Sequence, residues 1–529
     1  MKYKEKYLAG YLARLFLRNP LTMILGVTLI VLGIVALSLM PREEDPQISI
    51  SGGVVVVSMP GASAAEVEQV VVRPLERRIK EIKGVEHIYG VASDNVGIVN
   101  VMYYIGENRE ASNLKLYDKV MQNMDQLPQG ASTPLVRPFD IDIDIPILSI
   151  AFYAKTPQGV DNVSLYKRVE AFRNSLGNVD NVAKTEIKGE HKEQFNIEID
   201  LTKLSAYHLS LEQIVGSLKS LTASSPEVKN RTQEGKLIVF GVKNALEKVE
   251  DIQNLIVANV GGSAVYLRDI AAIHLGDDIQ NKKSAQISYK QGENFTPLQD
   301  QVTLSVSKLK GSNAVVIAGD VLKRLEASKS VLESEGIGYI VTRNYGERAN
   351  EAVNELVFHL LISIVIIALL LIFILGWREG LIVTLTVPAI LAITIFIAYM
   401  SDQTINRITL FAFLLSLGLL VDDVIVVIEN IHRHLHAKDA HEKEMDELLI
   451  EATDEIGAPT NLATIAIILT MVPMAFVGQM MGEFMKPIPL NVPVAMLSSL
   501  LIAYIFTPFL ARKFLKKPDH TKGEGHAKV

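Results

Sequence analysis

Long apolar stretches alternate with polar segments along the chain, and six of them are long enough to cross a membrane. A transmembrane helix needs roughly 20 consecutive, mostly apolar residues. The six stretches cover residues 21–40, 356–375, 381–400, 408–428, 458–480 and 487–511. Core helices of soluble proteins rarely stay nearly free of charge over this length, so the pattern predicts six transmembrane helices.

Basic residues at the two ends of the chain predict its orientation. They precede the first span and follow the sixth: Lys2, Lys4, Lys6, Arg14 and Arg18, then Arg512, Lys513, Lys516 and Lys517. Cytoplasmic segments beside membrane spans are enriched in Lys and Arg. Both ends are therefore expected in the cytoplasm, with residues 41–352 on the other side. The first span exceeds the roughly 7–15 apolar residues of a signal peptide and is interpreted as a retained anchor. Residues 432–457 predict an amphipathic helix on the inner membrane surface.

The external region shows alternating strand and helix patterns. Residues 41–138 predict the order of a ferredoxin-like split βαβ unit, with Ser63 and Glu66 as a capping box at its first helix. A second such unit is interrupted, with one half in 139–188 and the other in 301–352. Residues 189–300 between them predict an inserted mixed α/β subdomain. The predicted fold class is a six-span α-helical transmembrane bundle with a large α/β extracytoplasmic domain. Inside the insert, the polar stretch 220–235 lacks apolar periodicity and predicts a long protruding loop.

Composition excludes several classes of function. The formal net charge of -7 does not favour nucleic-acid binding. The absence of Cys excludes disulfides, thiol catalysis and thiolate metal sites. The sequence lacks the Gly-x-x-x-x-Gly-Lys motif, so ATP is not the expected energy source. No His or Met cluster marks a metal path in the external region. We expect no enzymatic activity, no metal and no cofactor.

Asp422 and Asp423 are the only acids inside the six apolar stretches. One intramembrane charge costs roughly 2.5–3.5 kcal/mol, so two adjacent acids indicate a function or a polar partner. Neighbouring carboxyl groups titrate as a coupled pair, and a charge crossing the membrane gains about 2.3 kcal/mol per 100 mV. We interpret the pair as a proton relay that drives a conformational change.

Two other roles are compatible with an acid pair inside an apolar stretch. One is a neutral pair held by hydroxyl or backbone groups, with a purely structural role. The other is an intramembrane aspartyl protease, whose two acids must face each other from different helices. Neighbouring residues on one helix point about 100° apart, which disfavours the protease.

The residues around this pair resemble a known family of permeases. Residues 418–430 read Gly-Leu-Leu-Val-Asp-Asp-Val-Ile-Val-Val-Ile-Glu-Asn, which is similar to the fourth transmembrane helix of resistance–nodulation–division (RND) permeases. Further similar motifs are Pro-Gly-Ala-Ser at 60–63 with Glu66, Pro-Leu-Glu at 74–76, Val-Pro-Met-Ala-Phe at 472–476 and Thr-Pro-Phe-Leu at 507–510. The resemblance extends to about Lys517 and covers half of a typical member, which has twelve spans.

The resemblance implies a domain organisation. A cytoplasmic N-terminus (1–20) and transmembrane helix 1 (21–40) precede a first porter subdomain (41–138). A second porter subdomain (139–188 and 301–352) encloses a docking subdomain (189–300), whose protruding loop resembles a hairpin that reaches a neighbouring protomer. Transmembrane helices 2–6 (353–511) and a cytoplasmic tail or linker (512–529) follow.

The resemblance also implies a function and partners. It implies an efflux permease in the bacterial inner membrane, driven by proton antiport, with residues 41–352 in the periplasm. The implied partners are a fused or separate C-terminal half, further protomers of a homotrimer, a periplasmic adaptor protein, an outer-membrane channel and the lipid bilayer. The six apolar stretches contain no Lys or Arg. The second half is therefore expected to supply the Lys that pairs with Asp422 and Asp423 in the family.

Five further residues are weaker site candidates. His359 in the second span and Glu429 directly after the fourth are candidate relay residues, with a position near the membrane interface as the alternative. By alignment with drug exporters of the family, Ile145, Pro146 and Ile187 match substrate-facing positions, although none of the three is aromatic. The Asp-Asp form of the fourth span favours exporters of hydrophobic or amphiphilic compounds. A metal-ion exporter and a non-transporting accessory half anchored in the membrane are the alternatives.

Overall fold

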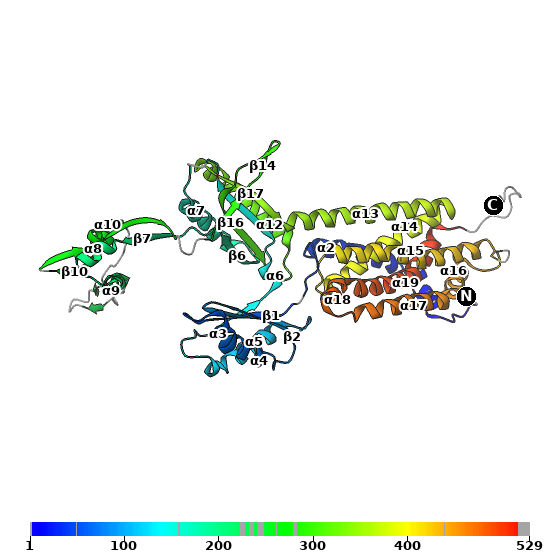
Figure 1. The fold of residues 1–529 in the computed structure, drawn as a ribbon. Coiled ribbons are helices and arrows are strands. Elements are labelled where there is room, and N and C mark those ends of the chain that lie inside the picture. Colours follow the sequence, from blue (N-terminus) through cyan, green and yellow to red (C-terminus); the bar gives the residue numbers. More distant parts are fainter. Residues whose placement is uncertain are drawn as a thin grey trace.

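The protein is elongated and is divided between a helical bundle and several α/β units (Figure 1). The computed structural model describes residues 3–48, 50–156, 159–222, 228–231, 237–240, 248–260, 262–278, 283–437 and 440–516. The bundle lies at one end of the molecule, two α/β units lie beside it, and the inserted subdomain lies farthest from it. The predicted linker at 518–529 lies outside the described residues.

The structure confirms the prediction of a six-span membrane protein. Within the described residues, six helical segments are long and apolar enough to cross a membrane. Their long helices are α2 (Leu21–Leu39), α13 (Tyr345–Ile374), α14 (Trp377–Met400), α15 (Arg407–Leu435), α17 (Gly457–Ala475) and α19 (Pro487–Phe514). The short helix α18 (Gln479–Met485) leads into α19, and α15 packs along α19 and α14 in the interior of the bundle.

Helix α13 begins earlier than its apolar stretch indicated. The apolar run starts at 356, whereas the helix starts at Tyr345, where the Asn344 side chain accepts a hydrogen bond from the Glu347 amide. The polar first turns of α13 are helical because they pack against α12 (Ala314–Ser334) of the external domain, with Gly346 in close contact with Ala318. One continuous helix therefore joins the external domain to the membrane bundle.

The end of the bundle at which α15 terminates differs from the prediction of a helix lying on the membrane surface. Residues 432–435 continue α15, and α16 (Met445–Glu455) packs against α15, α19 and the N-terminal helix α1 (Leu8–Leu17). Apolar residues of α16 such as Leu448, Leu449 and Ala452 are buried in this contact. The amphipathic pattern correctly predicts a helix here, but protein, and not the membrane surface, covers the apolar face of α16.

The first external unit, in residues 52–139, is a four-stranded antiparallel sheet covered by helices. Its strands are β1 (Gly52–Ser58), β2 (Val85–Ser93), β3 (Val96–Tyr103) and β4 (Leu135–Phe139), in the order β2-β3-β1-β4. A helical run comprises α3 (Ala64–Val67), a π turn and α4 (Arg73–Ile79), and α5 (Arg109–Met121) follows β3. The predicted capping box is present, because the Ser63 amide donates to Glu66 at 2.9 Å.

The second unit is assembled from two distant segments and has the same strand order. Its strands are β5 (Leu148–Ala154), β6 (Val182–Lys188), β16 (Gln299–Lys308) and β17 (Ile337–Asn344), with β16 between β5 and β6 and β17 on the other side of β5. Helices α7 (Asn162–Ser175) and α12 pack on this sheet, β13 (Ala285–Ile287) pairs with the first residues of β16, and α6 (Ile141–Asp144) precedes β5.

The insert between these segments contains small sheets and short helices. Strand β7 (Glu193–Ile199) pairs with β12 (Ala271–Asp277), and β10 (Ile256–Val260) pairs with β11 (Ser263–Tyr266). The remaining elements are α8 (Leu201–Ala206), α9 (Leu211–Thr222), α10 (Val249–Gln253), α11 (Leu267–Ile270) and the pair β14 (Lys290–Gln291) and β15 (Asn294–Phe295). The predicted loop at 220–235 includes β8 (Val228–Arg231), which pairs with β9 (Leu237–Phe240); its other residues past Thr222 lie outside the described ranges.

Candidate functional site

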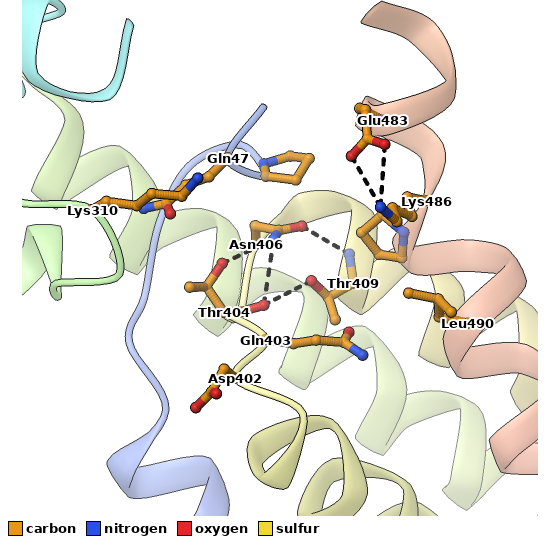
Figure 2. A pocket seen from close by; sticks show the side chains of 12 residues that line it. Gln47, Lys310, Asp402, Gln403, Thr404, Asn406, Thr409, Glu483, Lys486 and Leu490 are labelled. Atoms are coloured by element: carbon orange, nitrogen blue, oxygen red, sulfur yellow. Dashed lines mark hydrogen bonds and ion pairs between the residues drawn. The ribbon is translucent and has the colours of Figure 1, made fainter. Parts of the chain in front are cut away.

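Helix α15 carries the acid pair through the middle of the bundle. Asn406 caps the helix by accepting hydrogen bonds from the amides of Ile408 and Thr409 at 3.0 and 2.9 Å. The Thr409 hydroxyl donates to the Thr404 carbonyl at 2.9 Å, so the loop before the helix is fixed to its first turn (Figure 2). Because the helix continues to Leu435, Asp422 and Asp423 lie near its centre and far from either end.

Asp423 lies in the protein interior. The residue is only 7% exposed, and its neighbours Leu420, Val424 and Val427 are fully buried. The Thr464 hydroxyl of α17 donates a hydrogen bond to Asp423 Oδ1 at 3.4 Å. Asp423 Oδ2 is buried and has no hydrogen-bond partner among the described residues. The carboxyl group is therefore only partly satisfied, which is costly in a medium of low dielectric.

Asp422 points to a different side of α15 and is exposed. It makes no hydrogen bond or ion pair with any residue that the structure describes. Phe411, Leu415, Gly418 and Glu429 are also exposed, and their spacing places them on the same face of the helix. A methyl group added at Gly418 would meet no atom within 4 Å in the described chain. This face of α15 is therefore open for contact with another segment.

The helices that pack in the bundle with α15 carry several buried hydroxyl-bearing side chains. Buried examples are Thr460 and Thr464 of α17 and Ser498, Ser499 and Thr507 of α19. The Ser499 hydroxyl donates to the Leu420 carbonyl at 2.7 Å, one turn from Asp423. Within the described part of the chain, no Lys or Arg pairs with either acid. The Asp423 carboxyl group can therefore bind a proton or accept a hydrogen bond. Among the described residues, no cation balances its negative charge when it is ionised.

The structure does not bring the two weaker relay candidates to Asp423. His359 is exposed on α13 and lies 3.7 Å from Glu355, one turn earlier on the same helix. Glu429 lies on the open face of α15, two turns beyond Asp422 toward the C-terminal end of the helix. Only Glu429 thus shares a surface with one of the acids.

The three residues aligned with drug-pocket positions have different environments in the structure. Ile145 is 45% exposed and lines a cavity of about 450 Å³ between the external domain and α18. The Pro146 carbonyl accepts a hydrogen bond from Arg343 at 3.5 Å. Ile187 is buried in the core of the second external unit, 6% exposed. Of the three, only Ile145 borders this cavity.

Sequence reasoning missed Thr464 as a residue of the site. A single Thr in a long apolar run is compatible with bonding to its own helix backbone. The signal was present in the type of residue, but only the packing of α17 against the bundle shows that this Thr reaches Asp423.

Comparison with known proteins identifies the family. A family model described as AcrB/AcrD/AcrF matches residues 12–528. The chain belongs to this family of RND permeases. It is 24% identical over 528 residues to an uncharacterized transporter of Haemophilus influenzae, covering 96% of this chain and 49% of that protein.

A second relative is the swarming motility protein SwrC of Bacillus subtilis. The identity is 25% over 521 residues, covering 90% of this chain and 47% of the relative. This RND chain thus spans about half the length of the curated relatives it matches.

Proposed function

We propose that this RND chain is the N-terminal half of a proton-driven efflux permease. The observation that carries the proposal is the position of Asp423: a carboxyl group buried at the centre of a transmembrane helix, with one oxygen unpaired. Such a group is costly unless it changes its protonation state or its partner during function. Its neighbour Asp422 lies on the open face of the same helix.

The open face supports a contact with a second half that supplies a cation. Asp422, Glu429 and the bare surface at Gly418 lie on it, whereas the opposite face of α15 is packed against α14 and α19. A Lys brought to this face would pair with Asp422 and compete with the proton for the acid pair. Protonation would release that cation, so binding of a proton and movement of the helix are linked.

The external domain is the proposed path for substrate. We interpret the units with strand orders β2-β3-β1-β4 and β6-β16-β5-β17 as ferredoxin-like porter subdomains, and the insert as a docking subdomain. The proposed location is the bacterial inner membrane, with this domain in the periplasm. The proposed assembly is a trimer with an adaptor protein and an outer-membrane channel.

Hydrophobic or amphiphilic compounds are the proposed substrates. The cavity next to Ile145 supports this class, because Ile48, Ile50, Ile147, Tyr345, Met480 and Phe484 also line it. Met480 and Phe484 belong to α18, which leads into a transmembrane helix. A compound dissolved in the outer part of the bilayer would therefore meet an apolar surface at this boundary.

The test measures export by the full-length protein that contains this chain. Cells without other efflux pumps are loaded with the hydrophobic dye N-phenyl-1-naphthylamine, and efflux is followed with and without a protonophore. Asp423→Asn should reduce efflux to the level of protonophore-treated cells. Glu429→Gln tests whether Glu429 takes part in the relay. Wild-type efflux by Asp423→Asn at normal protein level would contradict the mechanism. A parallel panel of zinc, copper and silver salts tests the metal-exporter alternative, and absence of all transport favours an accessory half.

A further inference from the structure

The segment that follows α2 lies between the membrane bundle and the second porter subdomain. We define residues 41–47, Pro-Arg-Glu-Glu-Asp-Pro-Gln, as the strap. Figure 2 shows its Gln47 beside the loop that carries Asp402, Gln403, Thr404 and Asn406 and leads into α15. The strap and this loop together line a cavity of about 230 Å³. The strap is thus in direct contact with the segment that starts the acid-bearing helix.

Backbone hydrogen bonds attach the strap to the loop before α15. The Ile405 amide donates to the Pro41 carbonyl at 2.9 Å, and the Glu43 amide donates to the Ile405 carbonyl at 3.0 Å. The Arg407 amide, at the first residue of α15, donates to the Glu44 carbonyl at 3.2 Å. The first two bonds form a short parallel bridge between Arg42 and Ile405. Movement of the outer end of α15 must therefore displace the strap or break this bridge.

Other contacts attach the strap to the second porter subdomain. Lys308, the last residue of β16, forms a buried ion pair with Glu43. The Ala314 amide, at the first residue of α12, donates to the Arg42 carbonyl at 3.2 Å. A buried charge pair is rigid when formed and costly to separate, because each charge would be left unpaired in a low dielectric. The strap is therefore held firmly at its porter side as well.

Glu44 joins two transmembrane helices at once. Its carboxylate lies 2.6 Å from Arg407, at the start of α15, and 3.3 Å from Arg348, in the first turn of α13. The Glu44 side chain is only 12% exposed. Both arginines lie near the positive ends of helix dipoles, where a cation is unfavourable. Asp45 of the strap also pairs with Arg407, at 3.3 Å, but Glu44 is the strap carboxylate that contacts both arginines. Without Glu44, no strap carboxylate in the described chain bridges the two guanidinium groups.

We propose that Glu44 is a positioning residue that couples α15 to α13, and hence to the porter domain, during transport. The proposal rests on the proposed function, because it needs α15 to move when the acid pair is protonated. Helix α13 continues directly from β17 of the second porter subdomain. A displacement of Arg407 is therefore passed through Glu44 to Arg348 and to the start of α13, while Glu43 and Lys308 carry it to β16.

A reversible covalent link tests the coupling. The 3.2 Å backbone hydrogen bond and the facing side chains place the Cα atoms of residues 44 and 407 within about 7 Å, the reach of a disulfide. This chain has no Cys, so a Glu44→Cys/Arg407→Cys double variant adds the only thiols in it. The full-length protein, with any Cys outside this chain replaced, is reconstituted in proteoliposomes. Export of N-phenyl-1-naphthylamine is driven there by an imposed proton gradient.

The single variant should lose export rate, and the disulfide in the oxidised double variant should restore it. Glu44→Cys should lower the maximal export rate at least threefold, with the half-saturating dye concentration unchanged within twofold. The oxidised double variant should regain at least half of the wild-type rate and lose it again on reduction. Glu351→Cys, an exposed acid on α13, is the matched control and should export normally. A wild-type rate in Glu44→Cys, or an oxidised double variant that is cross-linked but no faster than its reduced form, would overturn the proposal.

A second measurement does not depend on export. Amide hydrogen exchange is compared between wild-type protein and Asp423→Asn, which mimics the neutral acid. Exchange should change in the loop 402–406 and in the first turns of α13, at 345–352. With Glu44→Gln added, the response of the loop should persist and that of α13 should disappear. An α13 response that is unaffected by Glu44→Gln would overturn the coupling, whereas this pattern in a protein that exports no dye would reject only the proposed function.

Discussion

The Thr464 hydroxyl of α17 reaches across the bundle to Asp423 of α15, with its oxygen 3.4 Å from Oδ1. Removing this donor leaves the buried carboxylate with still fewer partners. We expect Thr464→Val to slow gradient-driven export about 2- to 10-fold, since one hydrogen bond contributes about 0.5–1.5 kcal/mol. Thr464→Ser keeps the hydroxyl and should export at close to the wild-type rate. Equal rates for the Val and Ser variants would show that the bond has no role in transport.

Asp454 of α16 anchors the N-terminal helix α1 to the bundle. It is fully buried and accepts hydrogen bonds from the amides of Lys6, Tyr7 and Gly10 at 2.7, 2.9 and 3.1 Å. Asp454→Ala leaves these donors without an acceptor and should destabilise the protein by about 2–4 kcal/mol. Helix α1 should then detach from α16 more easily, so limited proteolysis should cleave the N-terminal segment faster, and the melting temperature should fall. Glu442→Ala, at an exposed acid, is the control and should change neither measurement.

Tyr103 of β3 makes the first external unit sensitive to alkaline pH. The side chain is 1% exposed, its hydroxyl donates to the Ser112 carbonyl, and burial raises its pKa to about 12. The unfolded chain, with a pKa of about 10, loses this proton first. Stability conferred by the neutral phenol is therefore present below pH ~10. Between about pH 10 and 12 it falls by about 2–3 kcal/mol.

The comparison of Tyr103→Phe with Tyr104→Phe isolates this effect. Tyr103→Phe should be about 1 kcal/mol less stable than wild type at pH 9, because it lacks the hydrogen bond. Its deficit should vanish or reverse by pH 12, when measured by chemical unfolding. Tyr104 is 55% exposed, so its Phe variant should follow the wild-type pH dependence. A constant deficit for Tyr103→Phe from pH 9 to 12 would contradict the assignment.

Gly33 allows α2 to pack closely against α14. A methyl group at this position would lie 2.5 Å from the Cα and 2.4 Å from the Cβ of Ala392. Gly33→Ala should therefore push the helices apart and cost about 1–3 kcal/mol, seen as a lower melting temperature. Gly418→Ala is the matched control, because a methyl group there would meet no atom of the described chain within 4 Å. If a second half covers that face of α15, Gly418→Ala should weaken assembly with it while leaving this chain stable.

The sequence by itself determined the membrane character of the protein and the location of its unusual charges. Apolar runs of membrane-spanning length are local properties, as is the presence of Asp422 and Asp423 within one of them, so both could be predicted without a structure. The Ser63–Glu66 capping box and the succession of strands and helices along each external segment are also short-range features. Family membership followed from motifs around the same acids.

Only the tertiary structure decided which of these residues share an environment. Asp422 and Asp423 are neighbours in sequence, but helix geometry and packing bury one and expose the other. Thr464, which bonds to Asp423, lies 41 residues away along the chain. Lys308, which pairs with Glu43, lies 265 residues away. The polar start of α13 is helical because α12 packs against it, which no hydrophobic pattern indicates. Contacts over such separations depend on how the segments fold together, so local patterns carry no signal for them.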